Sequence, residues 1–282
     1  MNNENRLGRF TSSNASRLTG GYGLKPVLKY YKTVEQYNEG KRATKVLKTE
    51  EEYLKFSKLE GIIHTFKPEI PQPFYTYVEE VNIQRSIGRS TSTDVKTRAI
   101  KWGRVMEVVL FNLLGLEYKL EYKNTFLHPK YGEFWSGTPD LVAEDKIGEI
   151  KCFEPLHFGK LSKLLIKGDI DEIKKEEKEV YWQCVSNAII CDKPKAEIIA
   201  YMPYKSELEA IIAQIEETNF LERHGMNDFD YYFMTHEPIE TLPYLPDDSK
   251  FSNINKLVFE VPEEDKEFLT ERMIEASKLL EE

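Results

Sequence analysis

A short apolar segment at residues 147–153 (Ile-Gly-Glu-Ile-Lys-Cys-Phe) constrains this chain most, because it carries two charged residues, Glu149 and Lys151. Side chains alternate between the two faces of a strand, so residues two positions apart share a face. Ile150 would then point into a core on the opposite face. A charged pair on an apolar strand costs free energy unless it has partners. The segment therefore predicts an internal strand with a polar site on one face.

A second motif, Ser-Gly-Thr-Pro-Asp at residues 136–140, lies just upstream and places Asp140 at the edge of a neighbouring strand. Asp140 and Glu149 together would form a hard oxygen site suited to Mg²⁺, or to Mn²⁺ in its place, with the backbone carbonyl of Ile150 as a further ligand. A metal held by carboxylates activates water and polarises a phosphoryl oxygen, and a second ion would stabilise the leaving 3′ oxygen. The ammonium of Lys151 would add positive charge beside the scissile phosphate. The pattern predicts metal-dependent phosphodiester hydrolysis.

Two helices are expected to complete this site. From Thr97 onward, apolar residues recur at three- and four-residue spacing, and Glu107 is a lone carboxylate on that largely apolar helix. Glu107 would add a carboxylate to the metal, directly or through water. Gln183, on a helix expected at residues 171–190, would hold the nucleophilic water or Lys151 in place.

The order of the expected elements predicts an α/β fold with a mixed central sheet flanked by helices. A helix from Thr97 is followed by strands at 117–127, 133–143 and 147–153, and then by a helix and a strand at 196–202. We expect a single domain over residues 1–282. Its expected parts are a basic, mostly helical N-terminal region at 1–96, a catalytic core at 97–205, and C-terminal helices and a strand at 206–282.

Composition excludes several classes of protein. No apolar run approaches the roughly 20 residues that span a bilayer, and no apolar segment follows Met1 as a secretory signal, so we expect a cytoplasmic protein without a membrane partner. Three cysteines argue against a disulfide framework and against any site that needs four cysteine ligands.

The net charge of −9 is unevenly distributed along the chain. Residues 1–101 hold 18 Lys and Arg against 11 Asp and Glu, so that this third is basic and the remainder is acidic. A basic third would line a channel for a polyanion, although a solvated basic face explains the same numbers. The Asp-x8-Glu-x-Lys string likewise has a plain alternative, a hairpin with a surface salt bridge. Its apolar strand and its upstream helix favour the nuclease interpretation.

Six motifs in chain order resemble the lambda-exonuclease or YqaJ-like viral recombinase family, within the PD-(D/E)xK nuclease superfamily. They are RLGRFTSS at 6–13, WGRVME at 102–107, SGTPDLV at 136–142, GEIKC at 148–152, VYWQCVSN at 180–187 and IIAYMPY at 198–204. The chain departs from the family at Leu141, where Gly often follows the PD motif. Residues 36–70 and 206–250 match no family segment.

The resemblance implies a restriction-endonuclease-like core and a magnesium-dependent 5′–3′ exonuclease. Such an enzyme digests linear double-stranded DNA from its ends and leaves 3′ overhangs for phage-type recombination. The resemblance further implies a single-strand annealing partner, a ring-shaped homotrimer in some members, and the host cytoplasm as location. By motif match, Arg6 and Ser13 would contact the 5′-terminal phosphate, with Arg9 and Arg17 as alternatives.

Two other functions stay open at this stage. A RecB-like or restriction-type endonuclease would use the same site. A non-catalytic DNA-binding protein that retains the fold is expected to have lost a carboxylate or the lysine, and none is missing here.

Overall fold

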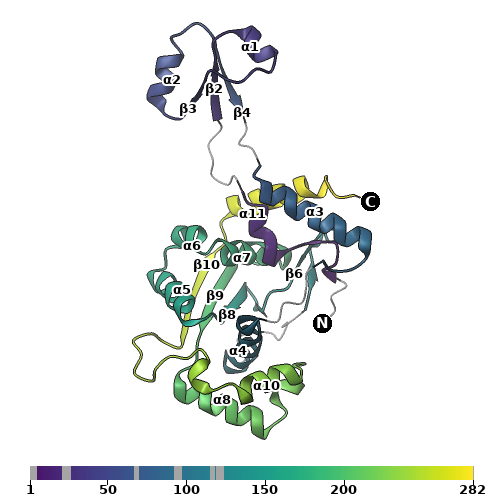
Figure 1. The fold of residues 1–282 in the computed structure, drawn as a ribbon, viewed down its shortest axis with the longest axis vertical. Coiled ribbons are helices and arrows are strands. Elements are labelled where there is room, and N and C mark those ends of the chain that lie inside the picture. Colours follow the sequence, from purple (N-terminus) through teal and green to yellow (C-terminus); the bar gives the residue numbers. More distant parts are fainter. Residues whose placement is uncertain are drawn as a thin grey trace. The chain divides into compact units, whose positions relative to one another are not determined.

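The computed structural model describes residues 5–20, 27–66, 70–91, 97–114, 118 and 124–281. The chain forms two compact units, a larger one of Met1–Leu18 with Tyr77–Glu282 and a smaller one of Thr19–Thr76 (Figure 1). Within the span that we expect to be a single domain, Thr19–Thr76 forms a compact unit of its own, inserted in the chain between the two segments of the larger unit.

The smaller unit contains a three-stranded antiparallel sheet with two short helices. Its strand order is β3-β2-β4, from β2 (Val27–Tyr31), β3 (Lys45–Leu47) and β4 (Ile62–Phe66). Thr33 and Thr49 cap α1 (Val34–Asn38) and α2 (Glu50–Phe56) with their side chains. Tyr30 and Tyr31 are both buried on opposite faces of β2, so they serve packing. Within the region 1–96, which we expect from the sequence to be mostly helical, these three strands were not predicted, because strands of three to five residues hardly show alternation in a lysine-rich sequence.

The larger unit is built on a four-stranded mixed sheet with the order β10-β9-β8-β7. These strands are β7 (Leu141–Val142), β8 (Lys146–Lys151), β9 (Lys195–Tyr201) and β10 (Ile254–Glu260). β8 and β9 run parallel, whereas β7 and β10 pair antiparallel with their neighbours. The mixed sheet flanked by helices confirms the expected α/β fold class.

Helices cover both faces of this sheet (Figure 1). On one face α4 (Arg98–Leu114) buries Trp102, Val105 and Met106 in a core cluster with Ile150 and Tyr201. On the other face lie α5 (Pro155–Lys167), α6 (Ile170–Glu176) and α7 (Lys178–Ile190), and α11 (Glu263–Ser277) packs on α7. The helix expected at 171–190 is thus two helices, α6 and α7, separated at Glu177.

A second, smaller sheet joins the N-terminal segment to the body of the larger unit. β1 (Phe10–Thr11) pairs parallel with β6 (Trp135–Gly137), and β5 (Phe126–Leu127) pairs antiparallel with β6. The 3-10 helix η2 (Ser12–Arg17) follows β1 and packs on α7. The hydroxyl of Tyr77 on α3 (Gln72–Ile87) accepts a hydrogen bond from the backbone N–H of Thr11 at 2.8 Å. This bond ties the N-terminal motif to α3, and the packing of η2 holds the motif against α7, the helix that carries Gln183.

The C-terminal helices extend the core beneath α4. They are α8 (Lys205–Glu217), α9 (Phe220–Arg223), α10 (Asp228–His236) and the 3-10 helix η4 (Ile239–Thr241). α10 forms within the Pro- and aromatic-rich segment 227–247. Asn227 and Asp230 make a capping box at its start, and Asp230 pairs with Arg104 of α4 at 3.3 Å. Among the described residues no helix is both long and apolar enough to cross a bilayer.

Candidate active site

Strand β8 places Glu149 and Lys151 on the face that α7 covers. Glu149 is fully buried, while Ile150 is 1% exposed and joins the core on the α4 face. Close pairing with β7 explains Gly148, since a Cβ there would lie 3.1 Å from the Leu141 side chain. The alternation expected from the sequence is therefore present: two charged side chains on one face of a strand and an apolar one on the other.

Asp140 lies at the start of β7, beside β8. Its Oδ2 accepts a hydrogen bond from the backbone N–H of Ile150 at 2.7 Å. Because Ile150 lies between Glu149 and Lys151, this bond brings the Asp140 carboxylate to the strand positions that carry the other two groups. The structure thus brings together the three residues that the sequence singled out.

The two carboxyl groups influence each other. Burial, and then the negative charge of Asp140, raise the pKa of Glu149 well above its ordinary value. Burial likewise raises the pKa of Asp140, with the charge of Lys151 opposing the rise. Carboxylates held in this way are short of positive charge, and a divalent cation would supply it.

Lys151 is held by two partners. Its Nζ lies 3.4 Å from Glu149 Oε2 and donates to Gln183 Oε1 at 3.1 Å. Burial alone would lower the pKa of Lys151, but the charges of Glu149 and Asp140 outweigh burial and raise it above the ordinary lysine value. Lys151 is therefore an ammonium at neutral pH, suited to stabilising negative charge and not to accepting a proton.

Glu107 lies on α4 near this group of residues. Its charge contributes to raising the pKa of both Lys151 and Cys152, and α4 packs directly on β8. Within the described part of the chain, no three His, Cys, Asp or Glu side chains converge closely enough for a preformed metal cage. The donors at hand are the two carboxylates of Asp140 and Glu149, with Glu107 farther out. Such hard oxygen donors fit Mg²⁺ or Mn²⁺.

Asn187 belongs to the site, although its place in the motif at 180–187 did not by itself indicate this role. It is fully buried on α7, and its Nδ2 donates to Glu149 Oε1. The sequence could have indicated Asn187, because it follows Gln183 by four residues and therefore lies on the same helix face.

Arg6 and Ser13 also lie together. Arg6 Nη2 donates to Ser13 Oγ at 3.2 Å, and the Thr11 hydroxyl lies 3.2 Å from the same oxygen. Ser13 is exposed at the beginning of η2. The guanidinium of Arg6 and two small hydroxyl side chains thus form a polar cluster at the surface of the larger unit.

The two alternative arginines are engaged elsewhere. Arg17 makes a bidentate ion pair with Glu80, at 2.6 and 2.7 Å, which lowers the pKa of the Glu80 carboxyl. Arg9 Nε donates to the carbonyl of Gly132 at 2.8 Å. Of the arginines considered from the sequence, Arg6 is the one the structure joins to Ser13.

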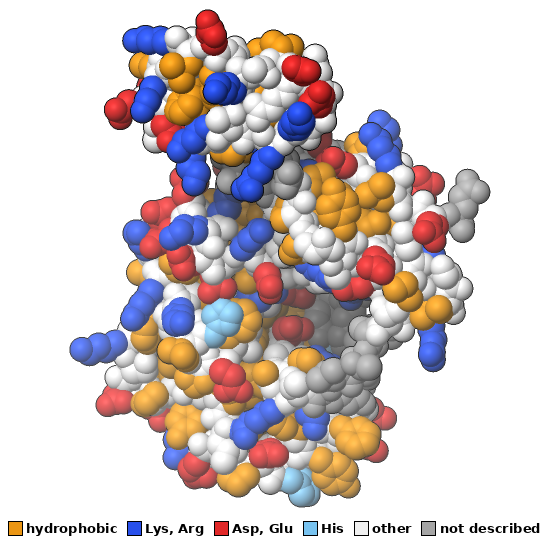
Figure 2. Space-filling model, turned by 45° about the horizontal axis from the view of Figure 1, so that its top comes forward, with side chains coloured by type: hydrophobic (Ala, Val, Ile, Leu, Met, Phe, Trp, Pro, Cys, Tyr) orange, Lys and Arg blue, Asp and Glu red, His pale blue; other side chains and the backbone are white. Residues whose placement is uncertain are grey.

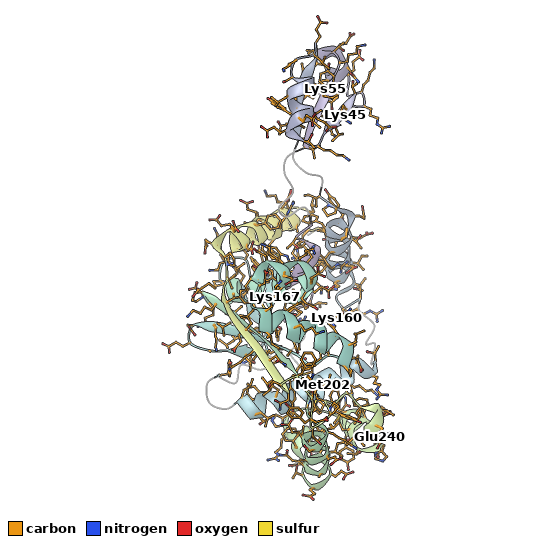
Figure 3. All side chains as sticks on the ribbon, turned by 90° about the vertical axis from the view of Figure 1, so that its left-hand side faces the viewer. Lys45, Lys55, Lys160, Lys167, Met202 and Glu240 are labelled. Carbon is orange, nitrogen blue, oxygen red and sulfur yellow. The ribbon has the colours of Figure 1, made fainter. Side chains whose placement is uncertain are left out.

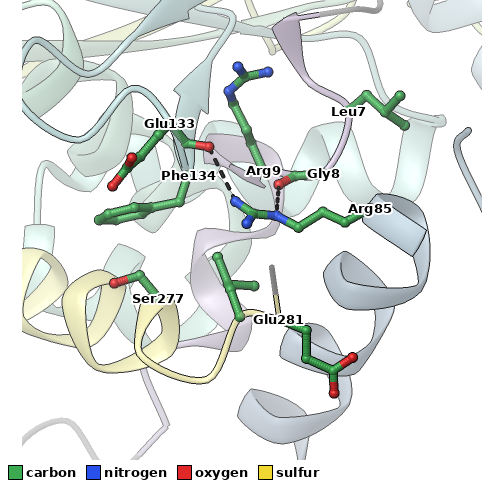
Figure 4. A pocket seen from close by; sticks show the side chains of 9 residues that line it. Leu7, Gly8, Arg9, Arg85, Glu133, Phe134, Ser277 and Glu281 are labelled. Carbon is green, nitrogen blue, oxygen red and sulfur yellow. Dashed lines mark hydrogen bonds between the residues drawn. The ribbon is translucent and has the colours of Figure 1, made fainter. Parts of the chain in front are cut away.

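Arg9 also lines a pocket of about 520 Å³ between the N-terminal segment, α3 and the end of α11. Figure 4 shows Arg85 reaching across it to the carbonyl oxygens of Gly8, at 2.8 Å, and Glu133, at 3.3 Å. These bonds hold the N-terminal segment against β6. The Arg85 guanidinium therefore has a structural role in this pocket.

Comparison with known proteins finds no matching family model and no matching curated protein. Three solved structures are similar in fold. An alkaline exonuclease from Laribacter hongkongensis has a TM-score of 0.48 at 11% identity, over 97% of this chain and 90% of that one. Its complex with dAMP has a TM-score of 0.47 at 13% identity, over 97% and 92%. A phage-related exonuclease from Haemophilus somnus 129PT has a TM-score of 0.49 at 14% identity, over 98% and 96%. At this level of likeness, the case for a function depends on the site itself.

Proposed function

We propose that this chain is a metal-dependent DNA nuclease that hydrolyses phosphodiester bonds at Asp140, Glu149 and Lys151. One observation carries the proposal: the fully buried Glu149 carboxylate lies 3.4 Å from the ammonium of Lys151, and a second, half-buried carboxylate, that of Asp140, lies close enough to raise the pKa of Glu149. A structural salt bridge would need one carboxylate for one lysine. Asp140 provides a second carboxylate beside the pair of Glu149 and Lys151, and a cation-binding site explains why it is there.

Asp140, Glu149 and the backbone carbonyl of Ile150 would hold Mg²⁺, or Mn²⁺ in its place, with Glu107 contributing through a water molecule. The ion, or a pair of ions, would activate the attacking water and stabilise charge on the phosphoryl group. Lys151 stays protonated and stabilises the negative charge that develops on the scissile phosphate. Gln183 fixes the direction of that ammonium through its 3.1 Å hydrogen bond.

We further propose that Arg6 and Ser13 bind the 5′-terminal phosphate of a DNA end. Arg6 has the planar donor fork that matches phosphate oxygens, and the Ser13 and Thr11 hydroxyls adjoin it. η2, which begins at Ser12, packs on α7, the helix that carries Gln183. The phosphate cluster and the cleavage site would then share one rigid support, as end-directed cleavage requires.

Helix α5 offers a surface for the DNA backbone near the site. It begins four residues after Lys151, and Lys160, Lys163 and Lys167 on it are exposed. Figure 3 labels Lys160 and Lys167 on this helix. Elsewhere on the face seen in Figure 2, basic and acidic side chains are interspersed. A local row of exposed lysines beside the site suits contacts to phosphates.

The family resemblance extends the proposal to a 5′–3′ exonuclease acting on linear double-stranded DNA in phage-type recombination. On that reading the product is a 3′ overhang for a single-strand annealing protein, and the enzyme is a homo-oligomer, with a ring-shaped trimer as the expected form. Sedimentation of the purified chain tests the oligomer, and co-purification tests the partner.

The deciding experiment incubates linear and covalently closed circular duplexes with Mg²⁺, using 3′-labelled and 5′-labelled linear DNA. We expect loss of the 5′ label first, with the circle intact. Cutting of the circle would instead favour a restriction-type or RecB-like endonuclease. Absence of cleavage with both Mg²⁺ and Mn²⁺ would favour a non-catalytic DNA-binding protein.

A further inference from the structure

Both oxygens of the Glu149 carboxylate have a partner on the site face. Oε2 faces the ammonium of Lys151 at 3.4 Å, whereas Oε1 accepts a hydrogen bond from the amide of Asn187. Glu149 and Asn187 are both fully buried. A carboxylate held at both oxygens cannot rotate without losing one of the two contacts.

The orientation of the Asn187 amide follows from the same contact. If the amide were turned over, its oxygen would face the Glu149 carboxylate, which is repulsive. In the observed orientation, Asn187 Oδ1 is buried with no hydrogen-bond partner among the described residues. Leaving a buried acceptor unpaired costs free energy of folding, so stability alone is a poor reason for an amide at this position.

Gly137 makes room for this amide. A Cβ at position 137 would lie 2.3 Å from Asn187 Oδ1 and 2.4 Å from Ser12 Oγ. Such a distance is well inside van der Waals contact, so any larger residue would push Asn187 away from β6. The glycine of the Ser-Gly-Thr-Pro-Asp motif thus supports the position of Glu149 through Asn187.

We propose that Asn187 is a positioning residue that aims the Glu149 carboxylate at the cation. The inference rests on the proposed function and deepens it. A neutral amide donor suits this task, because it directs one oxygen without cancelling the negative charge that a divalent ion needs. Groups that orient a metal ligand from behind commonly alter metal affinity by 10- to 100-fold.

The neighbouring residue Ser186 provides a matched control. It is equally buried on α7, and its hydroxyl lies 2.8 Å from Ser12 Oγ and accepts from Trp135 Nε1 at 2.9 Å. Ser186→Ala therefore removes buried hydrogen bonds one residue away from Asn187. None of these bonds reaches Glu149.

The test measures Mn²⁺ binding to the full-length chain by calorimetry, with thermal unfolding recorded in parallel. Asn187→Leu keeps the side-chain volume and removes the donor, and Asn187→Ala serves if the leucine variant unfolds. We expect about 10-fold weaker Mn²⁺ binding in the Asn187 variants. With DNA, we expect a lower kcat at limiting Mn²⁺ and an unchanged KM for DNA. Ser186→Ala should lower the unfolding temperature and leave Mn²⁺ affinity as in the unaltered chain.

Gly137→Ala gives an independent arm, because it displaces Asn187 without altering it. We expect weaker Mn²⁺ binding from it, and little further loss when it is combined with Asn187→Ala. Wild-type Mn²⁺ affinity in a folded Asn187 variant, or an equal loss in Ser186→Ala, overturns the positioning role. Failure of the unaltered chain to bind Mn²⁺ would overturn the proposed function itself, so the two failures are distinguishable.

Discussion

The carboxylate of Asp140 accepts the backbone N–H of Ile150 at 2.7 Å, and this one bond joins the two halves of the candidate site. It crosses from the residue before β7 to the C-terminal end of β8. Glu149 and Lys151 flank Ile150 and point to the opposite face from its side chain. The Asp140 carboxylate is thereby fixed relative to both, before any ion or DNA is bound.

Removal of the Lys151 ammonium is expected to slow cleavage strongly. Lys151→Ala should lower kcat by about 10²- to 10³-fold, because a fixed charge beside the reacting phosphate is lost. DNA binding should stay largely intact, as measured by fluorescence anisotropy. Lys175→Ala, at an exposed lysine paired with Glu176, is the control. Full activity of the Lys151 variant would remove the lysine from the mechanism.

Removal of the Glu149 charge should stabilise the metal-free protein. The folded-state pKa of Glu149 is raised, so ionisation opposes folding, and the loss of stability grows as pH rises from the ordinary carboxyl value through the folded one. In the presence of a chelator, Glu149→Gln should therefore raise the unfolding free energy, by about 1 kcal/mol, more at pH 8 than at pH 5. Thermal unfolding at the two pH values measures the difference. If Glu149→Gln instead destabilised the protein at pH 8, the partners of the Glu149 carboxylate would already compensate its negative charge in the metal-free state.

The Mg²⁺ requirement for cleavage should depend on pH. Protons compete with the cation for Asp140 and Glu149, and both pKa values are raised. The Mg²⁺ concentration for half-maximal cleavage should therefore rise as pH falls, and chelation should stop the reaction. Titrations of activity with Mg²⁺ at several pH values check this. A half-maximal concentration independent of pH would contradict carboxylate ligation.

Arg6→Ala is expected to reduce the preference for 5′-phosphorylated ends. The variant loses a charge-assisted contact, so we expect a reduction of roughly 10-fold in the ratio of rates on phosphorylated and unphosphorylated duplexes. Arg17→Ala should instead lower stability through loss of its pair with Glu80, and leave the ratio unchanged. An unaltered ratio in the Arg6 variant would show that Arg6 does not bind the 5′-terminal phosphate.

Charge removal on α5 should weaken DNA binding without affecting metal binding. For Lys160→Gln with Lys163→Gln, we expect the slope of log affinity against log salt to fall by about one to two. Mn²⁺ affinity should be unchanged, since neither lysine contacts the carboxylates. The measurement is DNA binding between low and moderate salt, and an unchanged slope would place the DNA elsewhere.

Those parts of the site that depend on local geometry could be predicted from the sequence. Glu149 and Lys151 share a face because side chains alternate along a strand, and the apolar neighbours of that strand placed it inside the fold. The helix at 97 onward was predictable because its apolar spacing extends over several turns. Gln183 was found as part of a motif on such a helix.

Contacts between segments that are distant in the sequence became visible in the folded chain alone. The Asp140–Ile150 bond, the Asn187–Glu149 contact and the Arg17–Glu80 pair each join residues that are separated by 10 to 63 positions. Their partners are chosen by packing, so no spacing rule could identify them. The sheet at Thr19–Thr76 was missed for a related reason: short strands are stabilised by their neighbours across the sheet, and that information is not local in the sequence.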